Sequence, residues 1–151
     1  DGVINKAKHM GLEGEINVRL SQLVNLGGKV YIDDYKLSDE EEAWGLPKFR
    51  MQANARFNIS DKFFVDAELS TQGNTYAYIY DYNTDGSRIA NSGHKATIGS
   101  FADLNAGAEY RIKKQFGIFV KANNIFGKEY ERYMYYPRLG FNVIGGLNYS
   151  F

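Results

Sequence analysis

The segment DYNTDGSRIANS places three oxygen-bearing side chains at the spacing of a calcium-binding loop. Asp81, Asn83 and Asp85 would take the first, third and fifth positions, and Gly86 follows at the sixth, where such loops turn sharply. Hard oxygen ligands at alternate positions suit Ca²⁺. However, Ser92 stands at position 12, where a bidentate glutamate would complete the coordination shell. The sequence therefore predicts either a calcium site at Asp81, Asn83 and Asp85 or an Asx-rich surface turn.

Histidine is the other residue type that invites a chemical interpretation, and the chain has two, His9 and His94. His94 lies in SGHK beside a long polar stretch, where it could serve as a general base. No nucleophile elbow and no metal motif accompanies it. We interpret both histidines as solvated residues at one rim of the molecule. The sequence predicts no catalytic residue, no cofactor other than Ca²⁺, and no enzymatic activity.

Two further surface segments have unusual compositions. The acidic run DEEE at 39–42 is interpreted as a solvated loop, with bridging to lipopolysaccharide through divalent cations as the alternative. The second segment could stack on a sugar or an aromatic chelate, but an interfacial belt or packing within its own loop is the preferred interpretation. It contains Tyr130, Tyr133, Met134, Tyr135 and Tyr136.

The composition points to β structure and excludes several partners. The formal net charge is +0, so a nucleic acid is not the expected partner. The absence of cysteine excludes disulfides and thiolate metal sites. The chain has 12 tyrosines and 10 phenylalanines but only two prolines. An aromatic-rich, glycine-rich chain without helical periodicity favours strands.

Strict alternation of apolar and polar residues recurs in seven segments of about the length that a tilted membrane strand needs. The clearest is PKFRMQANARFN, where Phe49, Met51, Ala53, Ala55 and Phe57 alternate with Lys48, Arg50, Gln52, Asn54 and Arg56. The others are GLEGEINVRL, NLGGKVYIDDYKL, FFVDAELST, FADLNAGAEYRI, FGIFVKANNIF and GFNVIGGLNYSF.

The connections between these segments alternate between short and long. Tight links are expected at 21–25, 60–62 and 113–115, and long links at 38–46, 80–97 and 128–139. Short turns on one side and long loops on the other are typical of outer-membrane barrels. A soluble antiparallel sandwich is the alternative, but its apolar face would need a second sheet. We therefore predict an all-β fold, an antiparallel transmembrane β-barrel segment of about seven strands. Aromatic girdles are expected near the strand ends, formed by Tyr76, Tyr78, Tyr110, Phe116, Tyr149 and Phe151.

The last twelve residues carry the same pattern. One face holds Phe141, Val143, Leu147, Tyr149 and Phe151. The other is polar except for Ile144. An apolar band that ends on an aromatic suits a strand whose outer face meets lipid.

These segments resemble the TonB-dependent outer-membrane receptors. INKAKHMGLEGEINVRLSQLVNLGGKVYIDDYKLSD is similar to a strand pair found late in their barrels, and LPKFRMQANARFNISDKFFVDAELSTQG to the next hairpin. FADLNAGAEYRIKKQFGIFVKANNIFGKEYERY resembles the family's "D-L-x-x-x-Y" strand followed by "V-x-N-[IL]-F-[DNG]-K-x-Y". The closing GLNYSF resembles the signal read by the barrel-assembly machinery, with Gly146, Tyr149 and Phe151 at its expected positions.

The resemblance implies a transport function. Such receptors are barrels of about 22 strands with a plug, and they import siderophores, vitamins or glycans. Residues 1–151 resemble the last third of the barrel and contain no plug domain, so the implied partners are membrane lipid, the rest of the barrel, the plug, the assembly machinery and TonB-type energy coupling. The implied location is the outer membrane of a Gram-negative bacterium, with a periplasmic C-terminus and extracellular long loops. A small self-standing barrel, acting as an adhesin or structural anchor, is the alternative.

Overall fold

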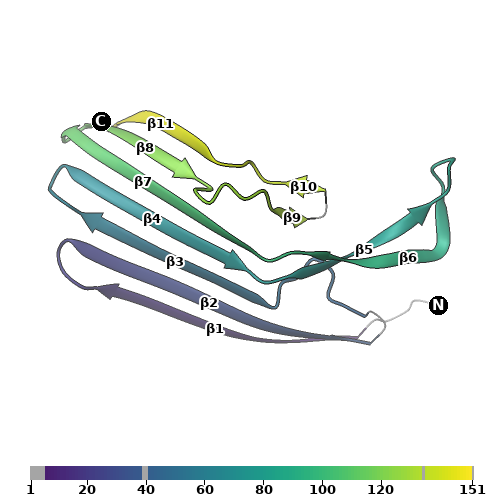
Figure 1. The fold of residues 1–151 in the computed structure, drawn as a ribbon. Helices are drawn as coiled ribbons and strands as arrows, with labels where there is room; N and C mark the ends of the chain where they lie inside the picture. The colour runs from purple at the N-terminus through teal and green to yellow at the C-terminus, as the bar shows by residue number, and fades with distance from the viewer. Residues whose placement is uncertain (1–5, 39–40, 134, 151) are drawn as a thin grey trace.

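Seven antiparallel strands lie side by side in a single layer in the computed structural model, which describes residues 6–38, 41–133 and 135–150 (Figure 1). Their order is β1-β2-β3-β4-β7-β8-β11. The bounds are β1 Ala7–Arg19, β2 Val24–Leu37, β3 Phe49–Asn58, β4 Phe63–Gln72, β7 Phe101–Lys113, β8 Phe116–Asn123 and β11 Asn142–Tyr149. The seven alternating segments of the sequence correspond to these seven strands, which confirms the predicted all-β, antiparallel fold.

The strand register brings most of the apolar residues of the seven strands to one face, with exceptions such as Ile144, Phe119 and Phe64. One row across the first five strands consists of Ile16, Gly28, Ala53, Leu69 and Leu104, each directly opposite the next. The adjacent row on the other face consists of Glu15, Lys29, Gln52, Ser70 and Asp103. Because side chains alternate with a period of two, a slip of one residue at any pair would exchange these faces.

No second layer covers the apolar face of the sheet among the described residues. Ile16 is 64% exposed and Leu147 is 69% exposed, and in the described chain the only buried hydrophobic residues are Ile98 and Tyr130. A water-soluble sandwich would hide this face against another sheet. In the described part of the chain, no helix has the length and apolar character needed to cross a membrane.

Two of the three tight turns are built in the same way. In the β1–β2 turn the Ser21 hydroxyl accepts hydrogen bonds from the backbone N–H groups of Leu23 (3.1 Å) and Val24 (3.2 Å). In the β3–β4 turn the Ser60 hydroxyl accepts them from Lys62 (3.3 Å) and Phe63 (3.1 Å). A serine that satisfies the backbone of a turn in this manner fixes the loop length. All three tight turns, including that between β7 and β8, lie at one end of the sheet (left in Figure 1).

The long link expected at 80–97 lies within a long connection between β4 and β7, but this connection contains a hairpin that the sequence did not predict. Strands β5 (Thr75–Tyr82) and β6 (Arg88–Ile98) pair with each other and extend beyond the sheet (Figure 1). In the main sheet Gln72 is opposite Phe101, and in the hairpin Thr75 is opposite Ile98. The register is therefore the same, and the hairpin continues the pairing of β4 with β7. A second small pair, β9 (Glu131–Tyr133) and β10 (Tyr136–Pro137), lies in the connection between β8 and β11.

The two faces should tolerate charge very differently. Replacing Ala55, which is in the middle of the apolar face, with arginine should lower the free energy of unfolding by about 2–4 kcal/mol if this face meets lipid. The control is Asn54→Arg, which adds the same side chain to the polar face opposite Glu68. Urea unfolding of the full-length protein in lipid vesicles gives both values. Equal losses for the two variants would contradict the assignment of the faces.

Candidate functional site

The polar face of the sheet carries ion pairs that cross from strand to strand. Lys29 on β2 pairs with Glu15 on β1 at 2.8 Å. The Asp33 carboxylate contacts His9 Nε2 at 2.8 Å and Arg50 Nη2 at 3.2 Å, and so joins three strands. Charged rows of this kind are expected where strands line a water-filled or protein-filled interior.

Asp33 approaches β1 closely because residue 11 is a glycine. A Cβ atom at Gly11 would lie 2.8 Å from Asp33 Oδ1, so any side chain there would displace the carboxylate. His9 is fixed from the other side, where its ring stacks on Tyr35 with 4.7 Å between centroids. His9 therefore lies near the long-connection end of β1, as predicted, but as the partner of a buried carboxylate rather than a freely solvated residue.

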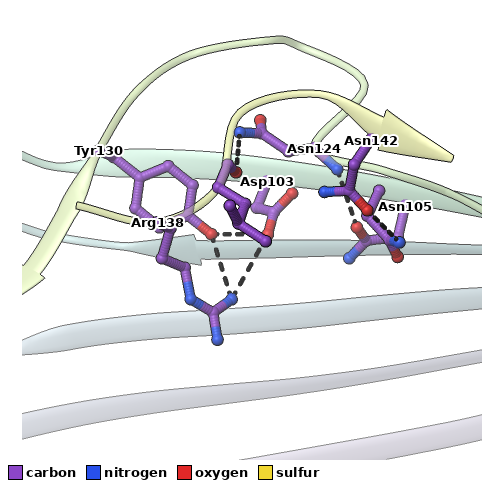
Figure 2. Close-up of a pocket in the computed structure, with 8 residues that line it drawn as sticks. Asp103, Asn105, Asn124, Tyr130, Arg138 and Asn142 are labelled. Carbon is purple, nitrogen blue, oxygen red and sulfur yellow. Dashed lines mark hydrogen bonds and ion pairs between the residues drawn. The ribbon is translucent and has the colours of Figure 1, made fainter. Parts of the chain in front are cut away.

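A pocket of about 330 Å³ lies at the long-connection end of the polar face, between β7 and the loop that joins β8 to β11. We call it the rim pocket. Asp103, Tyr130 and Arg138 converge in it (Figure 2). The Tyr130 hydroxyl donates to Asp103 Oδ2 at 2.6 Å, and Arg138 Nη1 lies 3.9 Å from the same oxygen. Phe101 stacks on the Tyr130 ring with 4.0 Å between centroids.

Asn124 shapes the loop over the rim pocket. Its φ is 49°, a left-handed conformation that asparagine tolerates better than most residues. Its side-chain amide donates to the carbonyl oxygens of Lys128 (2.9 Å) and Leu139 (3.2 Å), which lie before and after the β9–β10 pair. Its backbone N–H donates to Asn105 Oδ1 at 3.1 Å. The NNIFGKEY motif, which the sequence offered only as a resemblance, thus has a structural role here.

The electrostatics of the rim pocket favour a ligand that donates hydrogen bonds. Burial, and then the hydrogen bond to Asp103, raise the pKa of the Tyr130 phenol, so it stays a neutral donor. Asp103 is 6% exposed and Asn124 is 3% exposed, yet Asp103 Oδ1 and Asn124 Oδ1 have no donor among the described residues. Both oxygens belong to residues lining this pocket, and each can accept a bond from an ammonium, amide or hydroxyl group.

The β5–β6 hairpin carries aromatic rings that face cations. Lys95 Nζ lies 4.6 Å from the centroid of Tyr76, and the Arg88 guanidinium lies 3.5 Å from that of Tyr80. Trp44, from the β2–β3 loop, packs edge-on against Tyr78 at 5.5 Å. Tyr76 and Tyr78 therefore lie within a hairpin that continues the β4–β7 ladder, and their assignment to an interfacial girdle stays a prediction.

Two residues of the acidic run, Glu41 and Glu42, hold the β2–β3 loop to the hairpin, whereas Asp39 and Glu40 lie outside the described residues. Lys95 Nζ lies 2.8 Å from Glu42 and 3.6 Å from Glu41, and the hydrogen bond to Glu42 raises the pKa of the lysine. The Gly45 N–H also donates to the Tyr76 carbonyl at 2.7 Å. Glu41 and Glu42 thus serve as contacts between loops, beyond the solvated role that the sequence predicted.

The predicted aromatic cluster at 130–136 does not form a single surface. Tyr130 is buried in the rim pocket, whereas Tyr135 and Tyr136 are exposed. Met134 and the side chain of Tyr133 lie outside the described residues. Tyr130 thus shows the loop packing that was preferred from the sequence, and stacking of this cluster on a ligand stays a prediction. The alternation of TYAYIYDY, four tyrosines at every second position, was the signal that could have identified β5.

The three residues of the predicted calcium site make separate hydrogen bonds. Asp81 accepts one from the Ser92 hydroxyl and lies 3.6 Å from His94 Nδ1. Asp85 accepts bonds from the backbone and hydroxyl of Ser87, which lower its pKa, and the Asn83 amide donates to the same hydroxyl. Within 6–38, 41–133 and 135–150, no group of three or more His, Cys, Asp or Glu residues is placed to hold a metal ion. Calcium binding stays a prediction.

The residues of the predicted assembly signal lie on β11 or beyond it. Gly146 is opposite Phe119, whose ring would be 2.7 Å from a Cβ atom at this position, so glycine makes room for the ring. Tyr149 is exposed opposite Phe116, on the apolar face. Ile144 lies on the polar face opposite Lys121, as the alternation predicted. Phe151 lies outside the described residues.

Solved structures share this arrangement of strands. The chain matches the ferripyoverdine receptor of the outer membrane of Pseudomonas aeruginosa with a TM-score of 0.77 and 18% identity, over 95% of this chain and 19% of that one. It matches the siderophore receptor PiuA from Acinetobacter baumannii (0.74, 16%, 97% and 22%) and the ferric-catecholate import receptor Fiu from Escherichia coli K12 in its closed form (0.76, 16%, 97% and 21%). No family model and no curated protein matches the chain.

The chain has the fold of an outer-membrane receptor barrel. The matched structures are TonB-dependent siderophore receptors, and the chain spans about a fifth of their length. At these identities the likeness is one of fold, and it agrees with the strand order, the two faces and the alternating connections described above.

Asn124 should be the residue that holds the loop over the rim pocket. Asn124→Ala removes two hydrogen bonds and places a β-carbon residue at φ 49°, so amide protection across 125–141 should fall by about 1–3 kcal/mol. Asn124→Gly is the matched control, because it removes the same bonds without the conformational cost and should lose less. Hydrogen exchange of the full-length protein measures both, and unchanged protection in both variants would contradict this role.

Proposed function

We propose that this chain forms part of the wall of a TonB-dependent outer-membrane receptor and makes up the C-terminal third of its barrel. The observation that supports this best is the uncovered apolar face, which spans all seven strands. The fold that carries this face matches a siderophore receptor over 95% of the chain. Lipid covers that face, and the polar face lines the interior. The tight turns then lie in the periplasm, and the β5–β6 hairpin and the rim pocket face the outside.

The remainder of the barrel and a plug are the proposed partners. Strands β1 and β11 end the described sheet, so their outer edges present backbone N–H and C=O groups. In hydrocarbon each unpaired group costs several kcal/mol, so both edges pair with further strands of the same barrel. The ion pairs and the rim pocket of the polar face then meet the plug or the ligand, and energy arrives through a TonB-type complex.

We propose a ferric siderophore, rather than a vitamin or a glycan, as the transported ligand. The matched receptors bind ferripyoverdine or import ferric catecholates, by their descriptions. The surface of this chain is compatible with such ligands, because Tyr78 and Tyr80 present exposed rings and Arg88 an exposed positive charge beyond the end of the sheet. Planar, anionic iron chelates suit a surface of aromatic and cationic groups.

Uptake of labelled iron tests the proposed function. The full-length protein, expressed in a strain without its own siderophore receptors, should accumulate ⁵⁵Fe from at least one ferric siderophore in an energy-dependent manner. The matched control is the same strain without TonB, where uptake should fall to background. Energy-dependent uptake of a vitamin or glycan with none of any ferric siderophore would contradict the ligand class, and no TonB-dependent uptake of any ligand would contradict transport.

The terminal aromatic should control assembly more than stability. Phe151→Asp in the full-length protein should remove most of the protein from the cell surface, because the assembly machinery no longer recognises the end of the strand. Phe151→Tyr keeps an aromatic ring there and should keep near-normal surface levels. Surface labelling of intact cells measures both variants, and a normal level for the aspartate variant would refute the assembly role of Gly146, Tyr149 and Phe151.

A further inference from the structure

Two lysines face each other directly across β1 and β2. The register pairs Lys8 with Lys36, and both side chains are exposed. Like charges at directly opposed positions destabilise an antiparallel pair. Neither lysine amine makes an ion pair or hydrogen bond with a residue in the described part of the chain.

Both lysines point to the apolar face of the sheet. The uninterrupted register places them on the same side as the pair Leu12 and Ile32. The intervening neighbours His9 and Tyr35 stack on each other on the opposite face.

Lys6 extends this group by one more position. The Lys6 N–H donates to the Ser38 hydroxyl at 3.1 Å and the Ser38 N–H to the Lys6 carbonyl at 3.0 Å, so the β1–β2 pairing continues through this residue. The alternation therefore gives Lys6 the same face as Lys8 and Lys36. We call these three residues the lysine cluster. Asp34, opposite Met10, is the acidic residue of this end of the face, so the charge there is positive overall.

The depth of the lysine cluster matches a lipid headgroup region. Strands in such barrels rise about 3.3 Å per residue and tilt by about 40°, so the stretch from Leu20 to Met10 covers about 25 Å along the membrane normal. That is the height of the apolar band of an outer-membrane barrel. Lys8 lies two positions beyond Met10, at the long-connection end, and so falls roughly 5 Å above the band.

A cleft of about 450 Å³ lies at this point, lined in part by Lys8, Met10, Asp34 and Lys36. The cleft has charged groups from Lys8, Asp34 and Lys36 and an apolar group from Met10, so it suits a ligand with a charged headgroup and an apolar chain. A phosphate held between the two opposed amines removes their repulsion, while acyl chains run down the face over Leu12 and Ile32. Free phosphate would use only the first of these features.

We propose that the lysine cluster binds the phosphorylated headgroup of a lipid in the outer leaflet. This site lies on the outside of the barrel wall, away from the polar face and the rim pocket. It rests on the placement of the chain in the outer membrane but not on transport.

The test measures lipid binding to the purified, delipidated full-length protein in detergent. The probes are bacterial lipid A, the same lipid A after removal of its phosphates, and inorganic phosphate. The variant is Lys8→Gln with Lys36→Gln. The matched control is Lys113→Gln with Lys114→Gln, two exposed lysines at the tight-turn end. Dissociation constants and thermal midpoints are recorded for each combination.

The double variant should bind lipid A about 30-fold more weakly than the parent, because each lysine near an anionic membrane surface contributes roughly fivefold. The control pair should bind as the parent does. Without lipid the double variant should have an unchanged or higher thermal midpoint, since a repulsion is removed, and lipid A should raise the midpoint of the parent only. A lower midpoint without lipid would assign the lysines a structural role instead.

Three results would overturn the proposal. Equal binding of lipid A to the parent and the double variant would show that the lysines take no part. Equal binding of dephosphorylated lipid A would show that only the apolar surface matters. Equal stabilisation by inorganic phosphate would make the ligand a free anion rather than a lipid. Iron uptake by the double variant should remain normal, so a failure of the transport proposal is seen separately.

Discussion

Hydrocarbon offers no hydrogen-bonding partner to the peptide backbone, and most of this structure follows from that constraint. Each strand of the main sheet pairs with the strands beside it, including β4 with β7 and β8 with β11, and only β1 and β11 have an outer edge without a partner strand in the described sheet. Once the backbone is paired, the side chains have two environments, and the period of two in the sequence assigns each residue to one of them. Ala55 and Asn54 are adjacent in the chain, yet Ala55 lies on the apolar face and Asn54 on the polar face.

The same constraint explains why the polar interactions gather where they do. The Asp33 contacts, the Glu15–Lys29 pair and the rim pocket all lie on one face or at its long-connection end. At the long-connection end the chain extends beyond the paired strands. Individual side-chain hydrogen bonds and ion pairs hold the loops there in place of regular strand pairing. Asn124 closes one loop with its side-chain amide, and Lys95 fastens another with Glu42. The tight-turn end needs only a serine in each of two turns.

The sequence predicted the seven strands and their faces because these depend on local alternation, as in MQANARF, and on nothing distant. It predicted the three tight turns for the same reason. It missed the β5–β6 hairpin, since the glycines and charges of DYNTDGSRIANSGHK look like a loop while the register inherited from β4 and β7 extends the ladder. It could not predict the rim pocket, because Asp103, Asn124 and Arg138 come from segments that meet only through strand order. The role of Gly146 likewise depended on knowing that Phe119 stands opposite.

The most direct test of this account uses the absence of cysteine from the 151 residues. Single cysteines placed along β3 from residue 50 to 57 in a cysteine-free version of the full-length protein would carry spin labels in lipid vesicles. Labels at 51, 53, 55 and 57 should collide with dissolved oxygen, and labels at 50, 52, 54 and 56 with a water-soluble nickel chelate, in strict alternation. An accessibility profile without a period of two, or one with the two sets exchanged, would contradict the claim that a single sheet separates lipid from a polar interior.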